Sequence, residues 1–417
     1  MKLNKKIALG TFSALAILSL TACGTSSSAN KSSNKEITVW AMGAEGENLP
    51  KVAADFTKET GIKVKVQNIP WANAHDKLLT AVASKQGPDV IQMGTTWMTE
   101  FKDAGALTDL SKYISKDKNL SDSNFYDANL ATTKFDGKSY GIPWANDVRV
   151  LYYRTDIFKK AGINEAPKTW DDLTKDAKIL STRGKGEYGI SIDPAEQSFA
   201  FMMANQAGSS LIKDGKAQFD QPEFVQGVSY INNFIQKGYA PKQPLSTDIT
   251  QTFGGTDSKT PMFISGPWMV SALNAAGNDI PGNYATAVLP EGPDNNDSVV
   301  GGNNLTIASW SKAKDESAKF ISFMSTPKEQ LAWYKLVNDL PTNKTALQDK
   351  SIAGNALMKP FVDQLDHAKP MPMVPQYEQI AQSYLTFQQN IWLKNANVTE
   401  QMKQFQTKAQ SLLDAKN

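Results

Sequence analysis

The sequence is poor in the side chains that most often build disulfides, metal centres and redox sites. Its 417 residues include one cysteine, Cys23, and two histidines, His75 and His367. A single cysteine cannot form an internal disulfide or a thiolate metal site. The two histidines lack the His-Glu-x-x-His spacing of zinc hydrolases. We therefore expect neither a catalytic metal nor a cofactor.

Sequence signatures of catalysis are also missing. The chain has no glycine-rich phosphate-binding loop and no Gly-x-Ser-x-Gly motif. Asp and Glu number 42, but their spacing marks no pair as the two carboxylates of a glycoside hydrolase. The sequence favours a binding protein over an enzyme, with a surface glycoside hydrolase as a remote alternative.

Neither sign of charge is in excess, and long apolar runs are absent. Lys and Arg number 44 against 42 acidic residues, whereas a nucleic-acid binder needs a basic stripe. The most apolar segment, residues 7–20, is shorter than the roughly 20 residues of a transmembrane helix. We predict no nucleic-acid partner and no membrane-spanning helix.

Cys23 ends a segment with the layout of a secretory signal. Lys2, Lys5 and Lys6 precede the apolar stretch, and Leu-Thr-Ala-Cys-Gly follows it. This order resembles a bacterial lipoprotein signal, in which the cysteine is lipidated and becomes the first mature residue. The alternative is an ordinary signal peptide with an incidental cysteine. We predict a signal peptide over residues 1–22, with the mature chain on the extracytoplasmic face of the cell membrane.

A polar tract follows the cysteine. Residues 24–35 read GTSSSANKSSNK and contain almost nothing that a core could bury. Such a composition is typical of a flexible linker. We therefore predict a tether over residues 23–35 and a folded body held at the membrane by a lipid.

The first part of the body alternates strand and helix patterns. This order predicts a parallel, doubly wound α/β sheet, whose ligands bind beyond the carboxyl ends of the strands. The loops in that position are residues 41–45 and 94–97. The expected elements are strands at 37–40, 62–66 and 89–93, and helices at 49–56 and 75–82. Gly61 is placed to cap the first of these helices.

Later segments give a second set of elements. Thr169 and Asp172 have the spacing of a capping box, which predicts a helix start there. Pro267 suits the first turn of a helix that begins at Trp268. The remaining expected elements are strands at 148–153, 262–264 and 305–307, and helices at 156–161, 316–324 and 329–337.

Several stretches, in this order, resemble the family 1 extracellular solute-binding proteins, which are the carbohydrate-binding components of ABC importers. The family implies an α/β fold of two lobes, each a mainly parallel sheet flanked by helices, which close on a ligand in the cleft between them. The stretches are ITVWAMGAEG, KQGPDVIQMGTTW, YGIPWANDVRVLYYRTDIFKKAGI, EAPKTWDDL, MFISGPWMV, GGNNLTIAS and PMPMVPQYEQI.

The resemblance implies a domain organisation and a function. We expect a first lobe from residues 36–145 and 300–342, and a second from 146–299 and 343–417. The protein would be a monomer that captures a carbohydrate, most simply an oligosaccharide, and delivers it to ABC permease subunits. A non-sugar solute such as a polyamine, an anion or a metal chelate is the alternative.

A sugar presents a rim of hydroxyls and an apolar ring face, so aromatic rings together with carboxylates, amides and guanidinium groups suit it. Trp268 matches the tryptophan that stacks on a sugar in the maltose-binding relative. Asp147 and Arg149 share one face of an extended segment. The expected ligand-binding residues are Glu45, Thr95, Thr96, Trp97, Trp144, Asp147, Arg149, Trp268, Asn304 and Tyr377.

The other tryptophans divide less clearly. Trp71 could contact a ligand or only pack, and its pattern leaves both open. Trp40, Trp170 and Trp333 are expected to pack in the core, because each lies within or at the start of a predicted element.

Overall fold

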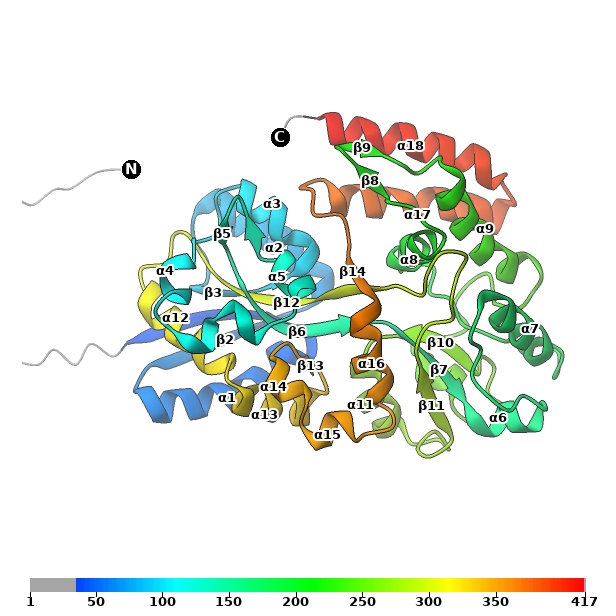
Figure 1. Ribbon diagram of the computed structural model, residues 1–417, viewed down its shortest axis with the longest axis horizontal. Coiled ribbons are helices and arrows are strands. Elements are labelled where there is room, and N and C mark those ends of the chain that lie inside the picture. The colour runs from blue at the N-terminus through cyan, green and yellow to red at the C-terminus, as the bar shows by residue number, and fades with distance from the viewer. Residues whose placement is uncertain (1–34, 416–417) are drawn as a thin grey trace, which may run out of the picture. The chain divides into compact units, whose positions relative to one another are not determined.

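The computed structural model describes residues 35–415 (Figure 1). The predicted signal peptide, Cys23 and nearly all of the tether lie outside the described residues. Within residues 35–415, no helix is both long and apolar enough to cross a membrane.

A seven-stranded mixed sheet forms the first half of the fold. Its strands run in the order β13-β6-β12-β3-β1-β2, and β14 pairs with β12. β1 pairs in parallel with both β2 and β3, as the strand–helix alternation predicts. The strands are β1 (Glu36–Met42), β2 (Lys63–Ile69), β3 (Val90–Gly94), β6 (Ile142–Val148), β12 (Ser298–Ile307), β13 (Leu340–Pro341) and β14 (Ala368–Pro370).

Two long neighbouring strands of this sheet lead to the second half of the fold (Figure 1). β6 and β12 are antiparallel, with Val148 opposite Val300 and Ile142 opposite Leu305. Gly302 sits in this pair with φ +100°, and a Cβ there would lie 2.1 Å from the carbonyl oxygen of Ala145. The two strands can approach this closely because residue 302 is glycine.

The second half contains a three-stranded sheet in the order β10-β7-β11, formed by β7 (Val150–Arg154), β10 (Met262–Ser265) and β11 (Tyr284–Ala287). Both pairings with β7 are antiparallel, so the expectation of a mainly parallel sheet in each lobe is wrong here. The cause is the route of the chain. β10 and β11 are parallel to each other, as strands joined through a helix should be, but β7 arrives between them from β6 in the opposite direction.

Helices cover both sheets. α1 ends at Gly61, whose φ of +73° gives the predicted left-handed cap. The capping box of α7 is present, with the Thr169 hydroxyl accepting from the backbone N–H of Asp172. The longer helices are α1 (Gly43–Thr60), α2 (Trp71–Ser84), α7 (Trp170–Ser181), α8 (Ser198–Gln206), α9 (Pro222–Gln236), α11 (Trp268–Ala276), α12 (Lys314–Met324), α13 (Pro327–Val337), α17 (Tyr377–Lys394) and α18 (Val398–Asp414).

Short elements connect these. They are α3 (Met98–Asp103), α4 (Ser111–Ile114), α5 (Asp127–Ala131), α6 (Thr155–Lys160), α10 (Ile249–Phe253), α14 (Lys344–Leu347), α15 (Lys350–Ala353), α16 (Lys359–Gln364), the hairpins β4 (Lys134–Phe135) with β5 (Lys138–Ser139) and β8 (Ile212–Lys213) with β9 (Lys216–Ala217), and the 3-10 turns η1 (Thr95–Trp97), η2 (Lys118–Leu120), η3 (Asp122–Asn124) and η4 (Leu365–His367).

Each sheet has its own hydrophobic core. Phe56 of α1 packs against Phe320 of α12 beside the large sheet, with ring centroids 5.3 Å apart. A separate aromatic group joins Phe201 of α8 to Phe405 of α18. We call these the large-sheet half and the small-sheet half. The residue boundaries predicted for the two lobes stay a prediction.

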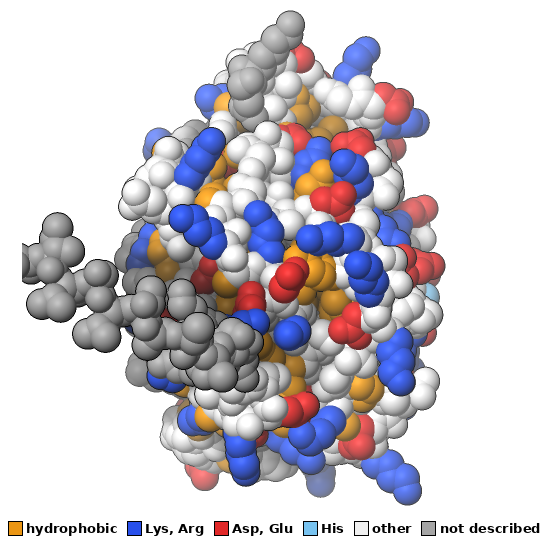
Figure 2. All heavy atoms as spheres, turned by 90° about the vertical axis from the view of Figure 1, so that its left-hand side faces the viewer, with side chains coloured by type: hydrophobic (Ala, Val, Ile, Leu, Met, Phe, Trp, Pro, Cys, Tyr) orange, Lys and Arg blue, Asp and Glu red, His pale blue; other side chains and the backbone are white. Residues whose placement is uncertain are grey.

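The surface agrees with the balanced composition. On the face drawn in Figure 2, Lys and Arg side chains alternate with Asp and Glu, and apolar side chains appear in small separate groups. Mixed surface charge of this kind is usual for a globular protein.

Candidate functional site

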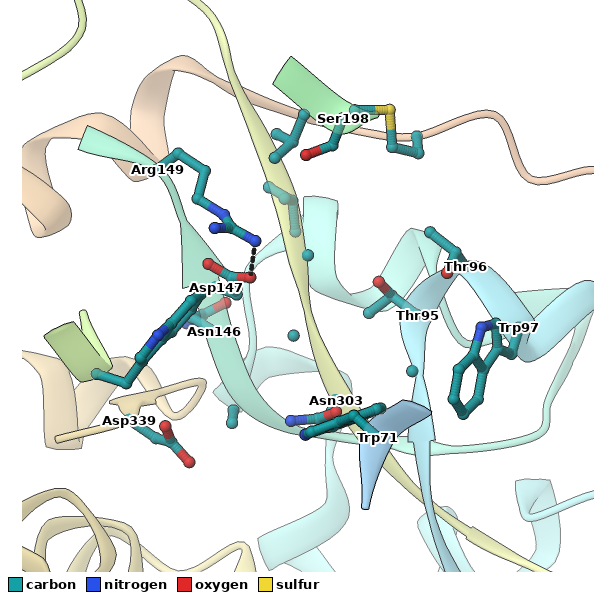
Figure 3. Close-up of a pocket in the computed structure, with 18 of the residues that line it drawn as sticks. Trp71, Thr95, Thr96, Trp97, Asn146, Asp147, Arg149, Ser198, Asn303 and Asp339 are labelled. Atoms are coloured by element: carbon teal, nitrogen blue, oxygen red, sulfur yellow. Dashed lines mark ion pairs between the residues drawn. The ribbon is translucent and has the colours of Figure 1, made fainter. Parts of the chain in front are cut away.

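A cavity of about 560 Å³ is lined by residues from both halves. It lies beyond the carboxyl ends of β1 and β3, where a parallel sheet presents its ligands. β6 and β12 pass along it (Figure 3). Eight of the ten predicted ligand-binding residues line this cavity: Glu45, Thr95, Thr96, Trp97, Asp147, Arg149, Trp268 and Tyr377.

One wall is built by turns that follow strands, and we call it the turn wall: Glu45, Trp71, Thr95 and Trp97. Glu45 lies in the first turn of α1, directly after β1. Its Oε1 accepts hydrogen bonds from Gln92 Nε2 at 3.1 Å and Asn303 Nδ2 at 3.2 Å. Burial raises the pKa of Glu45, and the nearby charge of Asp147 raises it further. The side chains that donate to this carboxylate are thus two neutral amides.

Trp71 is the most exposed aromatic side chain of the turn wall. It is 39% exposed and packs edge-on against Trp97, with ring centroids 5.6 Å apart. Gly43 supports the ring from beneath, because its φ is +56° and a Cβ there would lie 2.9 Å from Trp71 Cδ1. Trp97 is only 9% exposed and also contacts His75. The turn wall thus offers one indole surface backed by another.

The opposite wall is held by charges, and we call it the charged wall: Asp147, Arg149, Glu196 and Trp268. Arg149 Nη2 lies 3.1 Å from Asp147 Oδ2 and 3.4 Å from Glu196 Oε2. The Arg149 guanidinium also lies over the Trp268 ring, 4.8 Å from its centroid, which is a cation–π distance. Figure 3 shows Asp147 and Arg149 facing the side occupied by Thr95, Thr96 and Trp97.

Trp268 begins α11 immediately after β10, as predicted. Gly266 makes its position possible, since a Cβ there would lie 1.9 Å from Trp268 Cζ3. The indole folds back over the glycine and so reaches the cavity. One ring face meets Arg149, and Trp268 lines the cavity beside it.

Asp339 adds a carboxylate to the cavity floor. It follows α13, is 8% exposed, and accepts a hydrogen bond from Trp333 Nε1 at 3.1 Å. Burial raises its pKa well above the usual value, and the charges of Glu45 and Asp147 raise it further. Burial also raises the pKa of Asp147, although Arg149 opposes this shift. Three carboxylates from separate segments therefore repel one another across the cavity.

The comparison with known proteins bears directly on this arrangement. Residues 41–331 match the family model of the bacterial extracellular solute-binding proteins. This chain belongs to that family. The match covers more than half of the sequence and includes both walls of the cavity.

Relatives and solved structures agree with the family assignment. The galactooligosaccharide-binding protein of Bacillus subtilis is 26% identical over 91% of this chain and 90% of its own. The maltooligosaccharide ABC transporter solute-binding lipoprotein of Streptococcus pneumoniae is 26% identical over 88% and 87%. The sugar-binding protein MalE of Xanthomonas citri superposes with a TM-score of 0.84 at 30% identity, covering 91% of this chain and 97% of that one. The MalE-like α/β fold is therefore confirmed.

Two of the predicted ligand-binding residues, Trp144 and Asn304, do not line the cavity of this solute-binding protein. Trp144 is 2% exposed and packs on Trp333, 4.9 Å between ring centroids. It lies three residues from Asp147 on a strand, so the two side chains point to opposite faces. Asn304 is buried and donates to the Thr132 hydroxyl. Its neighbour Asn303 faces the cavity instead.

The remaining predicted residues differ in how much they present to the cavity of the solute-binding protein. Thr95 and Tyr377 line it although they are only 6% and 3% exposed. Sequence reasoning missed Asn303, Asp339, Glu196 and Ser198, and left Trp71 open. No motif marks Asp339 or Glu196; only tertiary packing brings them here.

Among residues 35–415, no group of three or more His, Cys, Asp and Glu side chains is placed to hold a metal ion. The cavity of this solute-binding protein can instead offer aromatic faces, hydrogen-bond acceptors and one shared guanidinium. Such a site binds and orients a polar solute.

Proposed function

We propose that this protein is the lipid-anchored, carbohydrate-binding component of an ABC importer, and that it passes an oligosaccharide to permease subunits. The observation that carries the proposal is the cavity itself, where the indoles of Trp71 and Trp268 occupy opposite walls between buried polar groups. A pyranose has apolar faces and a polar rim, so it is complementary to such a pocket. The proposed ligand contacts are the residues of the two walls with Thr96, Asn303 and Tyr377.

The names of the relatives support a carbohydrate ligand and a role in an ABC importer. Their names specify galactooligosaccharide and maltooligosaccharide, and one is an ABC transporter lipoprotein. The lipobox ending at Cys23 supports the anchor. Family membership favours binding over catalysis, and we propose a monomer without enzymatic activity.

A thermal-shift screen against mono- and oligosaccharides tests whether the ligand is a carbohydrate. A ligand at 100 times its Kd stabilises the native state by about 2.7 kcal/mol, which is readily measured. Polyamines, inorganic anions and metal chelates serve as the comparison set. Stabilisation by saccharides, with the saccharide recovered unchanged, supports the proposal. Stabilisation by the comparison set alone, or hydrolysis of the saccharide, contradicts it.

Replacement of Cys23 by Ser tests the anchor. The variant lacks the thiol that would carry the lipid, so it should leave the membrane fraction. Ser28→Ala, within the same polar tract, is the matched control and should stay membrane-bound. A C23S protein that is as firmly attached as the parent would disprove the lipid anchor.

We also infer that the two predicted lobes close on the ligand. The cavity takes residues from both halves, and the extended strands β6 and β12 are the candidate hinge. A ligand that contacts both walls shifts the population toward a closed form. Small-angle scattering should show a smaller radius of gyration with a bound saccharide. Identical profiles would indicate a rigid pocket.

A further inference from the structure

The cavity is unbalanced in charge. Five of its lining residues are acidic, namely Glu45, Asp147, Glu196, Asp339 and Glu378. Arg149 is the one basic residue among the described residues that line it. The imbalance is local, since the whole chain carries nearly equal numbers of acidic and basic residues.

Arg149 is already used within the protein. Its Nη2 contacts both Asp147 and Glu196, and its guanidinium lies on Trp268. Even so, Asp147 Oδ1 is buried and has no hydrogen-bond partner among the described residues. A buried, unpartnered carboxylate oxygen is costly, so a ligand donor at this point would be favourable.

Glu45 and Asp339 have no cationic partner at all within residues 35–415. Glu45 is held by two side-chain amides, and Asp339 by one indole N–H. Asp339 is more than nine-tenths buried and lines the cavity. Burial raises the pKa of both carboxylates, and the charge of Asp147 raises it further.

Two occupants could relieve this repulsion. A metal ion would need the carboxylates gathered around one point, and no such group of three exists among the described residues. A ligand ammonium is the better match, because its Coulombic attraction to the carboxylates acts across the cavity and does not require three of them around one point. The flanking Trp71 and Trp268 would also attract a cation through their ring faces.

We propose that the cavity selects a saccharide that carries a free ammonium group, an amino sugar, with the ammonium on the side of the cavity that Asp147, Asp339 and Glu45 line. This inference rests on the proposed carbohydrate function and narrows its substrate class. An anionic sugar meets the same carboxylates as like charges and is excluded. Neutral sugars can still use the aromatic faces, but they leave the acidic floor uncompensated.

Matched probes on one backbone test the proposal. Cellotriose, the chitosan trimer and the N-acetylated chitin trimer differ only at carbon 2, which carries a hydroxyl, an amine or an acetamide. Glucose with glucosamine and galactose with galactosamine repeat the comparison on single rings, and glucuronate and galacturonate supply the anions. Calorimetry near neutral pH should give about tenfold tighter binding for each amine than for its hydroxyl counterpart, and no binding of the anions.

Three results would be decisive against this inference in different ways. If neutral sugars bind and their amino counterparts bind equally or more weakly, the amino-sugar preference is wrong while the carbohydrate function stands. If anionic sugars bind as well as amines, the charge argument is wrong. If no saccharide of any class binds, both this inference and the proposed function fall.

Variants of the acidic residues test which side chains cause the preference for an amine. Asp339→Asn and Glu45→Gln keep the shape and the hydrogen-bond acceptors but remove charge, so the amine-to-hydroxyl affinity ratio should fall toward one. Glu59→Gln removes an exposed carboxylate from the end of α1, distant from the cavity lining, and should keep the parent ratio. Cooperative melting curves, with melting temperatures no lower than that of the parent, confirm that each variant is folded. A ratio that survives in the D339N/E45Q double variant would overturn the assignment.

Discussion

The two walls of the cavity are held in place by different physics. In the turn wall, backbone turns, a positive-φ glycine under Trp71 and two amides on Glu45 set the positions. In the charged wall, one guanidinium joins two carboxylates and an indole. The turn wall therefore depends on packing and close backbone approach, whereas the charged wall depends on a partly buried ion-pair network.

The difference has consequences for mutation. Removing one member of a buried charge network leaves the others unpaired, so the loss exceeds the worth of the contact. Removing one member of a packed turn deletes apolar contact and leaves no charge behind. We expect stability to be more sensitive in the charged wall, and binding to depend on both.

Arg149→Met should give the largest effect. The change leaves Asp147 and Glu196 without their cation, and we expect a loss of about 2 to 3 kcal/mol in the free energy of unfolding. Urea denaturation measures it. Lys168→Met is the control, because Lys168 pairs with Glu165 on the open surface, where pairs contribute less than about 1 kcal/mol. Equal losses in the two variants would abolish the distinction between the walls.

Trp268→Ala should give the next largest effect, which is a loss of saccharide binding. The ring loses its stacking face, which corresponds to about 1.5 to 3 kcal/mol or roughly tenfold to a hundredfold in Kd. Calorimetry with a saccharide found in the screen measures the loss. Trp170→Ala is the contrasting variant: Trp170 stacks on Tyr230 in the small-sheet core, so it should lower stability more than affinity. An unchanged Kd for W268A would assign Trp268 to packing alone.

Trp71→Ala should have a smaller effect on binding, about threefold to tenfold in Kd. Its ring is already partly in water and gains less burial from a ligand than a sheltered ring does. The unfolding free energy should change little, because Trp71 is already 39% exposed in the parent. The same calorimetric series gives the ranking. A loss larger than that of W268A would make the turn wall the principal stacking surface.

Glu45→Gln should have the smallest effect and the opposite sign. Burial raises the pKa of Glu45 in the folded state, so its ionisation opposes folding. The parent therefore loses stability as pH rises from the unfolded-state value of about 4.3 through the raised folded value. The E45Q protein should be more stable than the parent by less than about 1 kcal/mol at neutral pH, and equally stable below that pH range. Thermal unfolding across pH checks this, and a destabilised variant at neutral pH would contradict it.

Much of the fold follows from local sequence. The periodicity of residues 37–93 identified three parallel strands and two helices, and Gly61 and the Thr169–Asp172 pair marked a helix end and a helix start. The antiparallel small sheet did not follow, because β7 joins it by continuing from β6. Strand direction there depends on a long-range route, which no local pattern records.

The site was predictable where a residue lies beside a recognisable turn. Glu45, Trp97 and Trp268 each follow a strand and line the cavity. Trp144 and Asn304 failed because a shift of one residue on a strand reverses the side-chain face, and a bulge lies between Asn303 and Asn304. Asp339 reaches the cavity only through the packing of α13, so its role depends on tertiary structure.

The small-sheet core is built from segments that lie far apart in the sequence, and this sets the order in which the two cores can fold. Phe201 packs against Tyr384 and Phe405, which belong to α17 and α18 near the end of the chain. The large-sheet core is complete once residues through Val337 exist. Because the N-terminal part of the chain is made first, the large-sheet core can assemble early. The small-sheet core stays open until the last two helices arrive, and loss of the C-terminal helix would leave Phe201, Phe219 and Phe224 exposed to aggregation.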